Sequence, residues 1–269
     1  MDEIDRLVEA VAGSPKYKYV SADVIRSVGL RELARRSSLR EAVKATKSRL
    51  HQVGAAYLSG RVQYAVWLDQ LRVAAQCADR AHLLQVCRKA MQCHSSTRER
   101  LPILEQFYTA TLADLPPIRS VLDVACGLNP LAIPWMPLSE NAEYYAYDMY
   151  TDMVSFLNAF MSIVGVHGQA LARDIVQSPP RRAADLALIL KSLPCIEQLD
   201  AAAGARLLDA LNVEHVLISF PVRSLGGADR GMLLNYETRF WELMRDRTWS
   251  ARRFEFETEL AFLVAKSTP

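Results

Sequence analysis

The stretch VLDVACGLNP, residues 121–130, changes from a strand pattern to a loop pattern and decides the fold class. Its first four residues suit an enclosed β-strand. Gly127, Asn129 and Pro130 then make continuation of that strand unfavourable. In open α/β sheets, ligands bind outside the carboxyl ends of the strands. We therefore expect a ligand site directly after this strand, in the loop that contains Gly127.

Downstream of this stretch, short apolar runs alternate with helical patterns. The runs are YYAYD (144–148), GQALARD (168–174), DLALIL (185–190), HVLISF (215–220) and FEFETELAFLVAK (254–266). This alternation predicts a mostly parallel sheet with crossover helices. We expect the last two of these runs, residues 215–220 and 254–266, to supply antiparallel edge strands. The expected fold class is α/β.

Upstream of it, the pattern is helical. Apolar residues recur at helical spacing in four segments: 21–36, 38–58, 64–76 and 81–94. Ser21 is a plausible N-cap for the first of them. LPPIRS, residues 115–120, is interpreted as a connector. We predict two domains, a helical one over residues 1–105 and an α/β one over residues 106–269.

The charge is also divided between the two parts of the chain. Residues 1–100 carry 18 Lys and Arg against 10 Asp and Glu, whereas residues 101–269 carry 14 against 20. A basic part next to an acidic part is typical of a protein that docks one half on a polyanion. A well-solvated helical surface explains the same charges. Charge alone leaves both interpretations open.

Composition sets further bounds. The chain has 269 residues, 51% of them hydrophobic, which is enough for a sizeable core. No apolar run approaches the ~20 residues that span a bilayer, and the acidic amino terminus lacks the apolar centre of a signal peptide. We expect no membrane association and a cytoplasmic location. Five cysteines without a C-x-x-C pair predict free thiols, and the isolated His51 and His94 predict no metal site.

The loop after residue 124 favours a nucleoside ligand. It has neither the G-x-G-x-x-G of a dinucleotide site nor the G-K-[ST] ending of a phosphate loop. Asp148 follows Gly127 by 21 residues, at a strand end where an acid accepts from ribose hydroxyls. Asp174 ends a third strand, where a carboxylate can accept from an adenine amino group. With Asp123, three strand ends in succession carry an acid.

Longer blocks carry a family resemblance. They are HSSTRERLP (94–102), DVACGLNPLAIPWM (123–136), LILKSLPCIE (188–197), ISFPVRSLGG (218–227) and ETELAFLVAK (257–266). The chain resembles the class I methyltransferases that use S-adenosylmethionine. More narrowly, it resembles the aminoglycoside-resistance 16S rRNA (guanine(1405)-N(7))-methyltransferases. The resemblance implies a Rossmann-like methyltransferase domain, S-adenosyl-L-methionine as cofactor and guanine N7 as the methylated atom.

The resemblance also implies cofactor contacts. Arg100 would bind the methionine carboxylate, since a guanidinium fork suits that group. Ala125 and Gly127 would let the cofactor approach the backbone. Asp148 would hold the ribose with Met149 beside the adenine. Further contacts to the adenine edge and the reacting centre would come from Asp174, Ile175 and Leu190.

Lys191, beside Leu190, is the predicted catalytic residue. Guanine N7 has an exposed lone pair, so its methylation needs no general base and depends mainly on alignment. A cation next to the charge that develops on the base would oppose the reaction. We therefore expect Lys191 to position groups in the site.

The implied partner is 16S rRNA within the assembled 30S subunit, bound by a monomer. Seven cations of the helical half are predicted to bind phosphates, namely Lys16, Lys18, Arg26, Arg40, Lys44, Lys47 and Arg49. Arg223 and Arg230 are predicted to lie near the target base. Three alternatives stay open: a neighbouring rRNA adenine as target, a small-molecule substrate on the same fold, and a non-catalytic RNA-binding protein.

Overall fold

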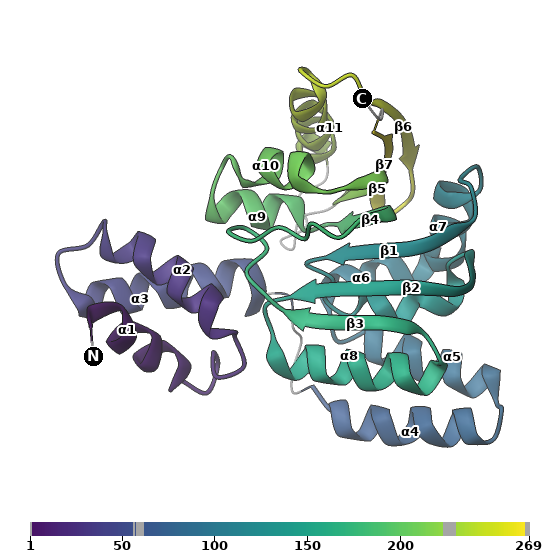
Figure 1. Cartoon of the computed structure of the whole chain (residues 1–269), viewed down its shortest axis with the longest axis horizontal. Coiled ribbons are helices and arrows are strands. Elements are labelled where there is room, and N and C mark those ends of the chain that lie inside the picture. Colours follow the sequence, from purple (N-terminus) through teal and green to yellow (C-terminus); the bar gives the residue numbers. More distant parts are fainter. Residues whose placement is uncertain (1, 56, 58–61, 223–229, 267–269) are drawn as a thin grey trace.

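The computed structural model describes residues 2–55, 57, 62–222 and 230–266, and a seven-stranded sheet forms its centre. The strand order is β3-β2-β1-β4-β5-β7-β6 (Figure 1). The strands are β1 (Ile118–Val124), β2 (Leu138–Asp148), β3 (His167–Ala172), β4 (Ala184–Leu190), β5 (Val213–Pro221), β6 (Ser250–Glu255) and β7 (Glu259–Ala265). The first five strands pair in parallel, and β7 pairs antiparallel with both β5 and β6. The predicted α/β class is confirmed. Of the two runs expected as antiparallel edge strands, β5 and β7 do pair antiparallel, but β5 is an inner strand parallel to β4, and β6 forms the edge.

Helices precede and cover the sheet. Those before it are α1 (Glu3–Ala12), α2 (Ala22–Leu33), α3 (Leu39–Leu50), the π-helical turn η1 (His51–Ala55), α4 (Tyr64–Gln76), α5 (Arg80–Met91), α6 (Ser95–Arg100), η2 (Leu101–Ile103) and α7 (Leu104–Leu112). The helices that lie between strands along the chain are η3 (Asn129–Trp135), α8 (Thr151–Val164), α9 (Leu193–Leu199), α10 (Ala203–Ala210) and α11 (Arg230–Met244). The four predicted helical segments all contain helix. Ser21 is the N-cap of α2, although its hydroxyl makes no capping bond to the helix backbone.

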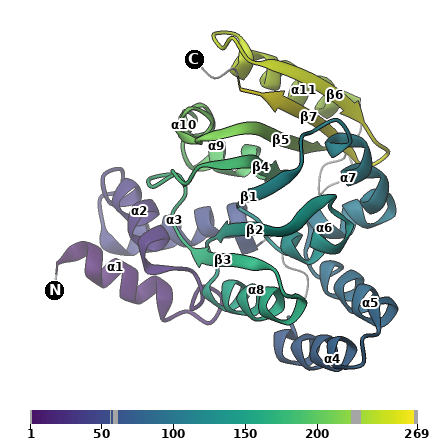
Figure 2. The same cartoon turned by 45° about the vertical axis from the view of Figure 1, so that its right-hand side comes forward.

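The sheet has a core on each face because its strand residues alternate between them. In β4, Leu186 and Leu188 belong to one apolar cluster, whereas Ala187 and Ile189 belong to the other. Helices α1 to α5, α7 and α8 contribute to the first cluster, and α9 to α11 contribute to the second (Figure 2). The connector prediction for residues 115–120 is wrong in its second half, because β1 begins at Ile118, which pairs with β2.

Helices α1, α2 and α3 form a bundle at the side of the sheet where β1, β2 and β3 end (Figure 1). The predicted division after residue 105 falls inside α7, and α4, α5 and α7 contribute side chains to the core of the sheet. Among the described helices, none is long and apolar enough to cross a membrane.

A short segment before α2 joins the bundle to the sheet. Val20 forms an antiparallel bridge with Tyr150, just beyond the end of β2. The Ser21 N–H donates to the Met149 carbonyl at 2.8 Å, and the Thr151 N–H donates to the Tyr19 carbonyl at 2.8 Å. The bundle is therefore attached by backbone hydrogen bonds at the carboxyl edge of the sheet, where a ligand site is expected.

Candidate cofactor site

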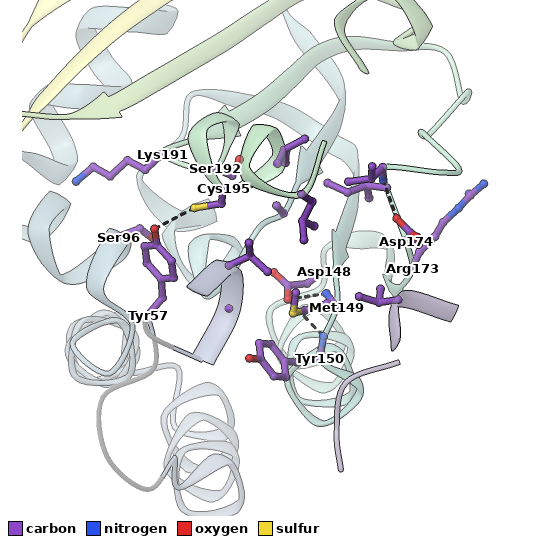
Figure 3. Close-up of a pocket in the computed structure, with 18 of the residues that line it drawn as sticks. Tyr57, Ser96, Asp148, Met149, Tyr150, Arg173, Asp174, Lys191, Ser192 and Cys195 are labelled. Atoms are coloured by element: carbon purple, nitrogen blue, oxygen red, sulfur yellow. Dashed lines mark hydrogen bonds between the residues drawn. The ribbon is translucent and has the colours of Figure 1, made fainter. Parts of the chain in front are cut away.

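A pocket of about 780 Å³, counted with its open mouth, lies at the carboxyl ends of β1, β2 and β4. Figure 3 shows Asp174 and Arg173 at one side of it, Asp148 and Met149 in the middle, and Tyr57 and Cys195 at the other side. Seven predicted site residues line this pocket: Ala125, Asp148, Met149, Asp174, Ile175, Leu190 and Lys191. Strand ends far apart in sequence thus meet in one cavity.

The loop after β1 turns sharply beneath the pocket. Ala125 has φ 53° and Gly127 has φ +52°, both in the left-handed region that disfavours a side chain. A Cβ added to Gly127 would lie 2.8 Å from Cε1 of His94, and His94 lines the pocket. The missing side chain of Gly127 therefore leaves the space that the His94 ring fills. Gly127 itself lies behind this ring and is not a lining residue.

Asp148, at the end of β2, holds that loop in place. Its Oδ2 accepts the Gly127 N–H at 2.9 Å, and its Oδ1 accepts the Met149 N–H at 2.7 Å. Burial raises the pKa of Asp148 even though these backbone donors favour the charged form. Each carboxylate oxygen has a second acceptor position. Asp148 can therefore support the loop and still accept hydrogen bonds from a ligand hydroxyl.

Asp174 lies after β3 and is almost fully buried. Its Oδ1 accepts the N–H groups of Val176 and Gln177 at 2.9 and 3.1 Å. These bonds leave Oδ2 as the oxygen that can accept from a ligand, and Asp174 lines the pocket beside Ile175. A flat apolar wall with one carboxylate at its edge fits a purine ring with an amino group, because few polar groups then fix the orientation.

Lys191 directly follows β4 with φ 58°, a strained conformation for a lysine. Its Nζ donates to Glu99 at 2.9 Å and lies 3.3 Å from Glu259. Figure 3 shows its amine end pointing away from Asp148. The lysine is therefore balanced by two carboxylates, as a buried cation requires, and its stem rather than its charge faces the pocket.

Arg100 lies beside Lys191 and Glu259. Its side chain is 1% exposed, and it is not a lining residue of the pocket. Its Nε and Nη2 donate to Glu259 at 3.0 and 2.6 Å, and its Nη1 donates to Asn129 at 2.9 Å. Burial would raise the pKa of Glu259, but Arg100 and Lys191 together lower it. A guanidinium has five N–H donors, so Arg100 can hold Glu259 and also offer a donor to another anion. Its contact with a methionine carboxylate stays a prediction.

Asp123 extends this buried network. Its Oδ2 accepts from Asn129 at 2.9 Å and from the Tyr144 hydroxyl at 2.6 Å. Burial raises the pKa of Asp123 to about 6 in spite of these donors. Asp123 belongs to the core below the pocket, so only two of the three strand-end acids line the cavity itself.

Three side chains at the other side of the pocket, those of Tyr57, His94 and Cys195, were not predicted from the sequence to line it. The rings of His94 and Tyr57 stack with centroids 6.1 Å apart, and the Tyr57 hydroxyl lies 2.9 Å from Sγ of Cys195. Burial and the nearby Arg100 lower the pKa of His94 to about 4, so the imidazole is neutral at pH 7. No group of metal-ligating side chains occurs among the described residues. The aromatic pair closes the cavity with an uncharged surface.

The predicted RNA-binding cations lie mostly on the bundle surface. Lys16, Lys18, Arg26, Arg40 and Lys44 are exposed, whereas Lys47 and Arg49 are partly buried. Arg26 pairs with Asp5 at 2.6 Å, and Arg49 lies 3.7 Å from Glu32. Arg223 lies outside the described residues, as does the side chain of Arg230.

Comparison with known proteins extends over nearly the whole chain. A family model described as ribosomal RNA methyltransferase (FmrO) matches residues 13–263. The 16S rRNA (guanine(1405)-N(7))-methyltransferase of Micromonospora echinospora is 34% identical over 267 residues, which cover 98% of this chain and 97% of that protein. The protein of the same name from Frankia casuarinae is 37% identical over 266 residues, which cover 98% of this chain and 94% of that protein. The crystal structure of the 16S rRNA methyltransferase RmtF in complex with S-adenosyl-L-homocysteine matches with a TM-score of 0.85 at 29% identity, covering 99% of this chain and 100% of that one.

Proposed function

Since this chain belongs to the family of 16S rRNA (guanine(1405)-N(7))-methyltransferases, we propose that it methylates N7 of that guanine and so gives resistance to aminoglycosides. The observation that carries this proposal is the meeting of Asp148 and Asp174 in one mostly apolar pocket beside the glycine loop. These two acceptors fit S-adenosyl-L-methionine, because their carboxylates can accept from the ribose hydroxyls and the adenine amino group while apolar walls enclose the purine.

The chain's residues divide the work of binding. Asp148 holds the ribose hydroxyls and Asp174 the adenine amino group, with Met149 and Ile175 against the purine. Ala125 brings the backbone close to the cofactor, Gly127 leaves room for the His94 ring in the pocket wall, and Leu190 lies beside the reacting centre. Arg100, fixed by Glu259 and Asn129, binds the methionine carboxylate.

Alignment supplies the catalysis. The bound cofactor offers a methyl group on a sulfonium, so the N7 lone pair forms the new N–C bond while the C–S pair returns to sulfur. No proton leaves N7 in this step, so no residue of the chain acts as a base. The amine of Lys191 pairs with Glu99 and Glu259, away from the base on which positive charge develops. Its stem helps to set the position of the guanine.

The helical half, residues 1–105, docks the enzyme on 16S rRNA through the exposed cations of α1 to α3, and residues 106–269 form the methyltransferase domain. We assign the assembled 30S subunit as the substrate, a monomer as the active form and the cytoplasm as the location. The basic character of residues 1–100, with 18 Lys and Arg against 10 Asp and Glu, supports docking on a polyanion.

Primer extension tests the target directly. Purified 30S subunits are treated with the enzyme and S-adenosylmethionine, and their rRNA is then cleaved chemically at N7-methylguanine. We expect one new stop at the guanine named by the family. A stop at a neighbouring adenine, detected with a reagent for methyladenine, contradicts the proposed target. Failure to bind the cofactor supports a non-catalytic RNA-binding protein.

The ribose contact predicts the effect of Asp148→Ala. Removing charge-assisted hydrogen bonds is expected to weaken cofactor binding by about 1–3 kcal/mol. Calorimetric titration with S-adenosyl-L-homocysteine measures this loss. Asp185→Ala is the matched control, because Asp185 accepts the Arg119 and Ser120 N–H groups at 2.6 and 2.9 Å, at the opposite end of β1. Equal affinity in both variants rejects the assignment of Asp148.

The docking surface predicts a salt-dependent defect. Replacing Lys44, Lys47 and Arg49 with glutamine is expected to weaken 30S binding and to reduce the slope of log affinity against log salt by about two to three, because fewer counterions are released. Cofactor affinity in the absence of 30S is expected to stay unchanged. The control neutralises three exposed arginines outside the bundle: Arg119, Arg181 and Arg252. If the triple variant has the same salt slope as the wild type, the basic bundle is a solvated surface that does not dock on rRNA.

A further inference from the structure

One wall of the cofactor pocket comes from the helical bundle and not from the methyltransferase sheet. Val24 of α2 and Val53 and Gly54 of η1 line the same cavity as Asp148 and Asp174. The packing is close, because a Cβ on Gly54 would lie 2.8 Å from Sδ of Met149. The bundle thus reaches the part of the pocket that is proposed to hold the adenosine.

Asp23, in the first turn of α2, makes a side-chain hydrogen bond across this boundary. Its Oδ2 accepts the backbone N–H of Asp174 at 2.9 Å, a bond between residues 151 positions apart. Its Oδ1 accepts the Val24 N–H at 3.0 Å and the Ser21 hydroxyl at 2.5 Å. Both oxygens of Asp23 are therefore oriented by the start of α2, and one of them holds Asp174.

The other end of α2 is held in a similar way. Arg31 donates to the carbonyl of Leu199 at 2.8 Å and lies 3.7 Å from the Asp200 carboxylate. Leu199 ends α9 and also lines the pocket. Helix α2 is thus anchored at two points of the pocket rim, so the position of Asp23 relative to Asp174 is well defined.

We propose that Asp23 is a positioning residue for cofactor recognition: by accepting the backbone N–H of Asp174, it fixes the Asp174 carboxylate toward the adenine amino group. This inference rests on the proposed use of Asp174 in the cofactor site. Asp174 has its Oδ1 committed to Val176 and Gln177, so the direction of Oδ2 depends on the backbone at residue 174. The bond from Asp23 fixes that backbone from the opposite side.

The test uses two ligands that differ at the adenine amino group. S-adenosyl-L-homocysteine carries this group, and its inosine analogue has a carbonyl oxygen there instead, which cannot donate to a carboxylate. In Asp23→Ala we expect the affinity for S-adenosyl-L-homocysteine to fall about threefold to tenfold, the usual effect of one lost hydrogen bond. The affinity for the inosine analogue is expected to change little. The ratio of the affinity for S-adenosyl-L-homocysteine to the affinity for the inosine analogue is therefore expected to fall. Asp23→Asn keeps one acceptor oxygen and is expected to give an intermediate ratio.

Asp5→Asn is the matched control. Asp5 lies on α1 of the same bundle and pairs with Arg26 at an exposed site, so this variant removes the same charge without touching Asp174. It is expected to bind both ligands as the wild type does. Equal loss of both ligands in Asp23→Ala, or no loss of either, overturns the proposal. The titration needs neither rRNA nor methyl transfer, so its outcome is independent of whether the proposed guanine is the target.

Discussion

Glu259→Ala is expected to destabilise the protein by about 3–5 kcal/mol, the cost of breaking a buried ion pair from one side. Glu259 is fully buried and lies between two buried cations, 2.6 Å from Nη2 of Arg100 and 3.3 Å from Nζ of Lys191. Without it, Arg100 has lost its carboxylate partner, and Lys191 has only Glu99. Cofactor affinity is expected to fall as well, since Arg100 then loses its bonds to Glu259 and keeps the one to Asn129.

Urea denaturation followed by fluorescence measures the change in unfolding free energy. Glu255→Ala is the control, because Glu255 lies on the adjacent strand β6 and pairs with Arg253 at 2.7 Å in an exposed position. Surface pairs contribute about 0–1 kcal/mol, so this variant is expected to resemble the wild type. If the two glutamate variants lose equal stability, the buried network does not hold the site together.

Gly127→Ala is expected to reduce cofactor affinity and stability together, by about 2–5 kcal/mol in total. Part of this cost is the left-handed backbone, with φ +52°. The remainder comes from the new methyl group, which lies 2.8 Å from the His94 ring and pushes it toward the cavity. A displaced ring occupies ligand space, so the loss of affinity is expected to exceed the loss that backbone strain alone produces.

Gly165→Ala separates the two causes. Gly165 caps α8 with φ +71°, and a Cβ there meets nothing within 4 Å. This control is expected to cost only the left-handed strain, about 1–2 kcal/mol of stability, with cofactor affinity unchanged. Calorimetric titration and thermal unfolding of both variants supply the comparison. If Gly127→Ala leaves the affinity for the cofactor unchanged, the His94 ring is not a wall of the ligand site.

The sheet could be predicted from the sequence because its strands are short apolar runs with local boundaries. β4 begins and ends within a residue of the predicted run, and helix α4 occupies the predicted segment 64–76. Asp148 and Asp174 could be placed in one pocket for a topological reason, since parallel strands end at the same edge of a sheet. The connector failed at Ile118 because an apolar residue after two prolines gives little local signal for strand pairing.

The wall of the pocket that comes from the helical half could not be predicted in the same way. Val24, Gly54 and His94 belong to helical or turn segments, and nothing in their local pattern indicates contact with a strand end. The pairing of Arg100 with Glu259 joins residues 159 positions apart. Such contacts depend on how the bundle and the sheet pack together, which hydrophobic periodicity does not encode.

Helix α2 takes part in two equilibria at once. Its exposed face belongs to the bundle proposed to meet the ribosome, and its two ends bond to the rim around the cofactor through Asp23 and Arg31. Thermodynamic linkage is reciprocal: any factor by which subunit binding changes cofactor affinity must equal the factor by which the cofactor changes subunit affinity. If docking on the subunit shifts α2, the affinity for the cofactor and the affinity for the subunit therefore change by one and the same factor.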